Sequence, residues 1–146
     1  MEVIVRTVKM DAELSAALRI RWVVFVEEQA IDENLERDEF DSVATHVIAE
    51  YQGEYIGAGR VLSSSEDEIG TARVGRIAVM KPFRRKGIAT LILKALETES
   101  ENQGFVKILL HAQSYTKSLY IKSGYKETGL PFFEAGIEHV TMIKDL

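Results

Sequence analysis

The spacing of hydrophobic side chains changes several times along the chain, and each change predicts a new element. Residues 3–8 are rich in β-branched side chains, which predicts a first strand. Over residues 12–28 apolar side chains recur at helical spacing, and Asp11 stands before them as a suitable N-cap. The apolar positions of this helix are Leu14, Ala17, Leu18, Trp22 and Phe25. Residues 30–42 are strongly acidic and show no period, so we expect a loop there.

The middle of the chain predicts three antiparallel strands. Residues 44–51 and 55–63 are rich in β-forming residues, and they flank Gln52-Gly53-Glu54, which is typical of a hairpin turn. A third strand is expected over residues 69–79, and Pro82 ends it.

The last part of the chain alternates helices and strands. Residues 87–103 carry apolar side chains at helical spacing, and Gly104 ends this helix. The elements expected after it are a buried strand over 105–111, a short helix over 116–123, and strands over 125–128 and 138–144 with a loop between them. The order β-α-β-β-β-α-β-α-β-β predicts an α+β, or mixed α/β, fold with helices on the faces of a sheet. No repeat or linker interrupts residues 1–146, so we expect one domain.

Composition and charge exclude several classes of protein. The net charge of −5 argues against non-specific binding to nucleic acid, which depends on neutralising phosphates. The chain has no cysteine, which excludes disulfides, a thiol nucleophile and thiolate metal sites. No histidine pair has the spacing of metal ligands on a helix, so no metal is expected. No signal peptide and no apolar segment of about 20 residues is present, so we expect a cytoplasmic protein without a membrane partner.

The segment from Val79 to Thr90 carries the most informative chemistry. A strand ends, a basic turn follows, and a helix begins at Gly87. The basic residues of the turn are Lys81, Arg84, Arg85 and Lys86. The free amides and partial positive charge of a helix N-terminus, next to these cations, predict a cradle for an anion such as a pyrophosphate. The alternative is a solvated basic turn before an ordinary helix. The glycine motifs of ATPases and of dinucleotide-binding dehydrogenases are absent.

Two motifs resemble those of the GNAT N-acetyltransferases. Arg84-x-x-Gly87-x-Ala89, after Arg76-Ile77-Ala78-Val79, is similar to the acetyl-coenzyme A signature of that family. Gln113 and the segment 118–125 resemble the family's Asn-x₆-Tyr-x-Lys-x-Gly-Phe/Tyr pattern. Further residues are similar to the ElaA/YjcF-like branch of small bacterial GNAT proteins, namely Arg21, Val24, Phe25, Glu28, Gln29, His46, His111, Ala112, Gln113, Gly136, Ile137, His139 and the acidic stretch to Asp41.

The resemblance implies the GNAT acyl-CoA N-acyltransferase fold, with a central, mostly antiparallel sheet and flanking helices. It also implies a binding site for acetyl-CoA on a bulged strand that splays from its neighbour. The backbone of Ile77, Ala78 and Val79 would meet the acetyl carbonyl and the pantetheine arm. The pyrophosphate would be surrounded by Arg84, Arg85, Lys86, Gly87, Ile88, Ala89 and Thr90. Gln113 stands where the family usually has Asn, and its amide is expected to pair with the pantetheine arm.

Three residues are expected to act in catalysis or acceptor binding. Tyr120 occupies the position of the family's general acid, which protonates the departing thiolate; the alternative is a helix tyrosine that packs on the sheet. His111 is a candidate general base, as are His46 and His139, although each would also serve as a hydrogen-bonded core residue. Glu28 shares a helix face with Arg21 and Phe25 by its spacing, and it either faces the acceptor or forms a salt bridge.

The resemblance thus implies an N-acetyltransferase that moves an acetyl group from acetyl-CoA to a primary amine. Without a cysteine to carry the acetyl group, we expect direct transfer in a ternary complex. The expected acceptor is a small amine or an amine-bearing peptide, attracted by the carboxylates of residues 27–41. Alternatives are another acyl-CoA donor and a non-catalytic acyl-CoA-binding sensor. The pair Phe132-Phe133 is expected to be exposed, either as a homodimer interface or as a lid on the acceptor site.

Overall fold

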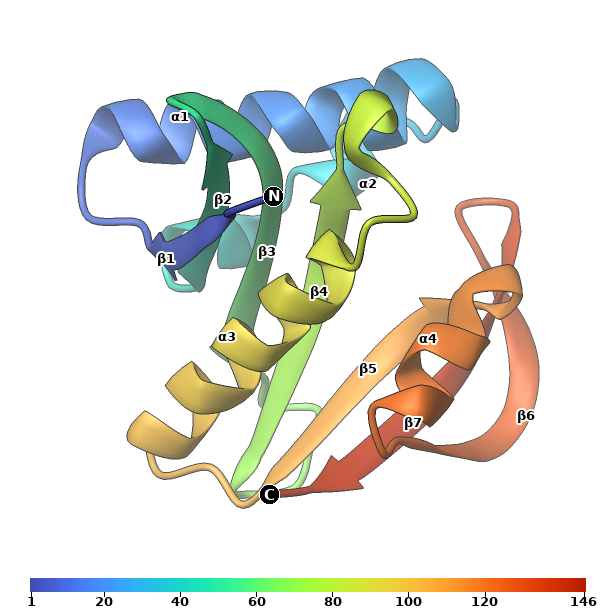
Figure 1. Cartoon of the computed structure of the whole chain (residues 1–146). Coiled ribbons are helices and arrows are strands. Elements are labelled where there is room, and N and C mark those ends of the chain that lie inside the picture. Colours follow the sequence, from blue (N-terminus) through green and yellow to red (C-terminus); the bar gives the residue numbers. More distant parts are fainter.

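A seven-stranded sheet forms the centre of the computed structural model, which describes residues 1–146 (Figure 1). Its strands are β1 (Ile4–Thr7), β2 (Thr45–Tyr51), β3 (Glu54–Ser63), β4 (Thr71–Val79), β5 (Lys107–Gln113), β6 (Lys126–Glu134) and β7 (Ile137–Asp145), in the spatial order β1-β2-β3-β4-β5-β7-β6. Only β4 and β5 run parallel; all other neighbours are antiparallel. The mixed, mostly antiparallel sheet predicted above is therefore confirmed.

Helices cover both faces of this sheet. The longer ones are α1 (Asp11–Arg21), which continues as the π-helix η1 (Trp22–Glu28), and α3 (Ile88–Asn102); the shorter ones are α2 (Glu33–Glu36), η2 (Glu39–Ser42), η3 (Lys81–Phe83), η4 (Ser114–Thr116) and α4 (Lys117–Lys122). The main apolar core lies between the sheet and the helices α3 and α4. A smaller core lies between α1 with η1 and the other side of β2, β3 and β4.

Two glycines of β3 let α3 pack closely on the sheet. A methyl group added at Gly59 would lie 2.9 Å from both Ile92 Cγ2 and Leu96 Cδ1, and one added at Gly57 would lie 2.7 Å from Ile92 Cδ1. Real side-chain carbons do not approach so closely, so any larger residue would push α3 outward. This close packing fixes where the N-terminus of α3 lies relative to β4.

Gly59→Ala is expected to lower the free energy of unfolding by about 1–3 kcal/mol, because overpacking a filled core costs that much. Urea denaturation followed by circular dichroism measures the change. Gly75→Ala is the matched control, because its added methyl would meet nothing within 4 Å. A cost for Gly59→Ala no larger than that of the control would contradict this account of the packing.

The first helix differs from its prediction in two ways. Asp11 is the first helical residue and not the cap, since Met10 holds the N-cap position. The Glu13 carboxylate satisfies this end of the helix, accepting hydrogen bonds from the amides of Lys9 (2.9 Å) and Met10 (3.2 Å). The helix then widens into a π-helix at Trp22. A π-helix adds residues to each turn, so positions beyond Trp22 rotate away from the face that regular spacing predicts.

Two segments expected to be loops have regular structure. The acidic residues 30–42 contain α2 and η2, whose side chains face buried guanidinium groups instead of an apolar core and therefore show no hydrophobic period. Residues 129–134 belong to β6, which pairs with β7 through a register shift between Thr128 and Phe132. Pro131 is tolerated there because an edge strand with a bulge does not need its missing amide. The other predicted elements agree with the structure within about two residues.

Candidate active site

The site lies where β4 and β5 separate. The two strands pair only over Thr71–Val74 and Lys107–Leu110, and beyond these residues they diverge (Figure 1). A cavity of about 630 Å³ lies in the opening, lined by both strands, by η1 and by the starts of α3 and α4. The opening leaves the edge of residues 75–79 without a partner from β5. Backbone amides and carbonyls of β4 are therefore available to a ligand in the cavity.

A bulge in β4 bends this strand at Arg76. Ala78 pairs with Ala58 and Gly75 pairs with Arg60, so two residues of β4 stand opposite Gly59. Arg76 adopts a left-handed conformation with a φ of 55°. Bulges of this kind re-aim side chains at strand ends, and here the Arg76 side chain enters the cavity wall. The bulge and the divergence of the two strands agree with what the resemblance implied.

The turn before α3 is shaped to receive an anion. Arg85 and Gly87 both have positive φ, of 62° and 80°, and the helix begins at Ile88. The first α-helical hydrogen bond is donated by Leu91 to the carbonyl of Gly87, so the amides of residues 88–90 are the ones a helix leaves free. A methyl at Gly87 would meet nothing within 4 Å, so the space before these amides is open. Arg85 and Lys86 are exposed beside it.

Arg84 turns away from the exposed side of this turn. Its Nε donates to the carbonyl of Val79 (2.9 Å), and its Nη2 donates to the carboxylate of Glu28 (2.9 Å). The carbonyl of Val79 is therefore already partnered. Glu28 forms this salt bridge and does not line the cavity, and its part in acceptor binding stays a prediction.

The prediction that Arg21, Phe25 and Glu28 share one face of the helix is wrong. Arg21 is buried with 1% exposure beneath α2, Phe25 lines the cavity, and Glu28 faces Arg84. The cause is the change to a π-helix at Trp22, which regular helical spacing does not include.

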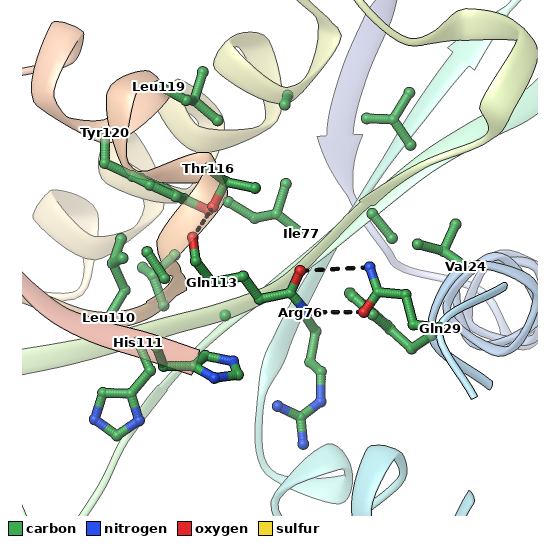
Figure 2. A pocket seen from close by; sticks show the side chains of 18 of the residues that line it. Val24, Gln29, Arg76, Ile77, Leu110, His111, Gln113, Thr116, Leu119 and Tyr120 are labelled. Atoms are coloured by element: carbon green, nitrogen blue, oxygen red, sulfur yellow. Dashed lines mark hydrogen bonds between the residues drawn. The ribbon is translucent and has the colours of Figure 1, made fainter. Parts of the chain in front are cut away.

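Tyr120 lies on the α4 side of the cavity, next to Leu119 and Thr116 (Figure 2). The residue is 9% exposed, and burial raises the pKa of its phenol to about 12. Its ring packs edge-on against Tyr125 at 5.9 Å, and the Tyr125 hydroxyl donates to Glu97 (2.8 Å). A phenol in this setting is protonated at neutral pH and is held in one orientation by its neighbours.

Gln113 is joined to a residue from the opposite side of the cavity. Its Nε2 donates to Gln29 Oε1 at 2.8 Å, and the reverse amide contact is 3.5 Å (Figure 2). Gln29 Nε2 also lies 3.4 Å from the Tyr115 hydroxyl. The pair links the end of β5 to the end of η1. Regular spacing did not assign Gln29 a role, because its partner is 84 residues away.

An arginine–carboxylate cluster forms one end of the cavity. It consists of Arg21, Arg60 and Arg76 with Glu36, Asp38 and Asp41. Arg60 Nη1 lies 2.7 Å from Asp38 and 2.8 Å from Asp41. Burial opposes ionisation of Asp41, but the hydrogen bonds from Arg21 and Arg60 outweigh it and hold the pKa of Asp41 well below its usual range. Three of the carboxylates in the acidic stretch 27–41, Glu36, Asp38 and Asp41, are thus occupied by arginines. The attraction of a cationic acceptor by this stretch stays a prediction that would depend on its other carboxylates.

Two of the three histidines line the cavity. His111 Nδ1 lies 3.2 Å from the carboxylate of Glu134, and Phe132 packs between His111 and His139 at ring distances of 4.8 and 5.9 Å. The hydrogen bond with His111 outweighs burial and lowers the pKa of Glu134. His46 lies elsewhere, with its Nε2 2.9 Å from the carbonyl of Asp41. Sequence reasoning missed Glu134 because it assigned this segment to a loop.

Phe132 and Phe133 do not form the exposed pair that was expected. Successive residues of β6 point to opposite faces, so Phe132 packs against the two histidines whereas Phe133 is 74% exposed. No group of three or more His, Cys, Asp or Glu side chains is placed to hold a metal ion. No helix has the length and hydrophobicity needed to cross a membrane.

Comparison with known proteins matches this chain to acetyltransferases. The acetyltransferase (GNAT) domain family matches residues 11–146. The Bacillus subtilis (strain 168) protein YjcF, described as an uncharacterized N-acetyltransferase, is 34% identical over 139 residues, which cover 94% of this chain and 96% of YjcF.

Solved structures share the fold. The crystal structure of Escherichia coli ElaA superposes with a TM-score of 0.84 at 23% identity, covering 98% of this chain and 99% of ElaA. A GNAT family acetyltransferase from Elizabethkingia anophelis, solved with acetyl-CoA bound, has a TM-score of 0.75 at 18% identity and covers 99% of this chain and 98% of its own.

Proposed function

The chain belongs to the GNAT acetyltransferase family, and on this basis we propose that it transfers an acetyl group from acetyl-CoA to a primary amine. The observation that carries the proposal is the cavity between β4 and β5, which has an anion-binding turn at one end and a buried phenol on its wall. Fold alone does not assign chemistry, so the proposal depends on these residues.

The donor would be held by main-chain groups. The free amides of residues 88–90 and the exposed cations Arg85 and Lys86 suit a pyrophosphate. The unpaired edge of β4 suits the amides of a pantetheine arm, which would add to the sheet as a further strand does. The acetyl-CoA-bound relative from Elizabethkingia anophelis supports this assignment, because it has the same fold.

The acceptor amine attacks the thioester carbonyl, so a C–N bond forms while the C–S bond breaks. We propose direct transfer; the lack of cysteine supports it, since no thiol can carry the acetyl group. Tyr120 donates its proton to the departing sulfur and regains one from solvent. His111, whose Nδ1 is held by Glu134, accepts the proton that the amine loses. Gln113 and Gln29 hold the two walls of the cavity together beside these groups.

Gly87→Glu is expected to weaken binding of acetyl-CoA by about tenfold or more. The new side chain would put a negative charge where the helix dipole favours an anion, and it would strain a residue with a φ of 80°. Isothermal titration calorimetry with acetyl-CoA measures the effect. Gly104→Glu is a matched control, since Gly104 follows the other end of α3, has a φ of 88° and also has open space before it.

The reaction itself is tested by release of thiol from acetyl-CoA across a panel of amines. Turnover with at least one amine supports an N-acetyltransferase. Tight binding of acetyl-CoA without release of thiol for any amine would instead identify a non-catalytic acyl-CoA-binding protein. Equal affinities of the Gly87→Glu and Gly104→Glu proteins would mean that the pyrophosphate binds elsewhere.

A further inference from the structure

The cavity wall presents arginines, while most of their carboxylate partners lie behind them. The arginines that line the cavity are Arg60, Arg73, Arg76, Arg84 and Arg85. Only two carboxylates line it, Glu36 and Glu134. The carboxylates paired with Arg60, Arg73 and Arg84 do not reach the wall. A ligand in the cavity therefore meets more positive than negative charge.

Among these arginines, Arg76 lies on the same side of the Gln29–Gln113 pair as His111, the expected general base, and it has an unused hydrogen-bond donor (Figure 2). Its Nε donates to the carbonyl of Glu36 (3.0 Å) and lies 3.2 Å from the carboxylate of the same residue, which also lines the cavity. Its Nη2 donates to the carbonyl of Leu35 (3.1 Å) and to Asp38 (3.2 Å). Its Nη1 has no hydrogen-bond partner, although the side chain is only 24% exposed. Arg84 and Arg85 belong to the turn before α3, and Arg73 donates twice to Asp67.

The opposite charge comes from the other side of the opening. Glu134, at the end of β6, holds His111 and lines the same cavity. His139 and Arg76 both lie close enough to favour its ionised form. Figure 2 shows Arg76 and His111 below the pair of Gln29 and Gln113 and Tyr120 above it. Arg76, with its free donor, and the carboxylate of Glu134 thus both lie near His111, the expected general base.

We propose that the acceptor is a free amino acid, or a similarly small amine that also carries a carboxylate. Its carboxylate accepts a hydrogen bond from Arg76 Nη1, and its ammonium group lies toward Glu134 and His111. This inference rests on the proposed acetyltransferase function and adds the class of its acceptor.

The chemistry of the reaction agrees with this placement. The ammonium group is attracted by Glu134 and loses one proton to His111, which passes it to solvent. The neutral amine then attacks, and His111 accepts the second proton that the nitrogen loses as the amide forms. Acetylation turns the amine into a neutral amide, so the product keeps the contact with Arg76 and loses the one with Glu134. The cavity must also hold the thiol end of the donor, so a volume of about 630 Å³ favours a small acceptor.

The test compares free L-amino acids with their C-terminal amides in a thiol-release assay with acetyl-CoA. At least one free amino acid is expected to exceed its amide in kcat/KM by about 10- to 100-fold, as one charge-assisted hydrogen bond provides. Arg76→Gln should remove most of this preference, measured within the variant as the ratio of kcat/KM for the free acid to kcat/KM for its amide. Arg37→Gln, an exposed arginine directly after α2, is the control and should keep the preference.

The wild-type comparison does not depend on the folding of any variant. Amides used as well as free acids, or turnover only with lysine-containing peptides, would overturn the acceptor class and leave the acetyltransferase function standing. Absence of thiol release with every amine of the panel, including amino acids, amides and peptides, despite binding of acetyl-CoA, would overturn both. Retention of the full preference by Arg76→Gln would overturn the role of Arg76.

Discussion

Replacing Tyr120 with Phe is expected to lower kcat by about 10²- to 10⁴-fold, the range typical of general acid catalysis, while the affinity for acetyl-CoA changes little. The substitution keeps the ring that packs on Tyr125 and removes only the proton donor. Burial raises the pKa of Tyr120 to about 12, so the phenol carries its proton throughout the neutral range. The same dry surroundings also raise the basicity of the departing thiolate, which favours its protonation.

Single-turnover kinetics with acetyl-CoA measures this effect on the chemical step, because the rate of product release does not contribute to it. The loss should shrink with a donor whose thiol is more acidic, because a better leaving group needs less protonation. Tyr55→Phe is the control, since Tyr55 lies on β3 away from the cavity and packs near Arg6. If the Tyr120→Phe protein had the same kcat as the wild type, this tyrosine would have only a structural role. The thiolate would then be protonated by water or by the proton that the amine loses.

Arg21→Met is expected to lower the free energy of unfolding by about 3–5 kcal/mol, as removal of one partner from a buried ion pair does. The Arg21 guanidinium donates to Glu36 (2.8 Å) and to Asp41 (2.7 Å), and it is 1% exposed. Without it, the carboxylate of Glu36, which is 5% exposed, loses its nearest cation and keeps only Arg76 at 3.2 Å.

Urea denaturation measures this loss. Arg19→Met is a matched control on the same helix, because Arg19 is exposed and forms no salt bridge, and it should change the value by less than about 0.5 kcal/mol. A cost for Arg21→Met below about 1 kcal/mol would mean that Arg60 and Arg76 suffice to balance the carboxylates.

Local signals explain why much of the fold could be predicted from the sequence. The period of apolar residues differs between strands and helices, and this identified the element order through α3 and α4. The turn at Gly87 was recognisable because its glycine and its cations are neighbours in sequence. Tyr120 was recognisable because its motif lies within one short helix and the turn after it.

Non-local pairing explains what the sequence did not reveal. Residues 33–42 face guanidinium groups from three distant elements, so no apolar period marks their two short helices. The π-helix is seven residues long, too short for its wider turn to appear as a period. Pro131 and Gly129 are typical of loops, yet a shift of strand register accommodates them within β6 and brings Glu134 to the cavity.

The short parallel contact between β4 and β5 also bears on the mechanics of the molecule. Antiparallel ladders hold β1–β4 together on one side and β5–β7 on the other. The two sides pair only over Thr71–Val74 and Lys107–Leu110, with a further backbone hydrogen bond from Val106 to Gly70 at the end of this pairing. The main core joins the two halves by side-chain packing, but few backbone hydrogen bonds do. We therefore expect backbone amides to exchange hydrogen faster along this seam than within either antiparallel ladder. If the donor binds along the unpaired edge of β4, as proposed, it would fill the opening between the two halves, and we expect its binding to slow hydrogen exchange along the seam.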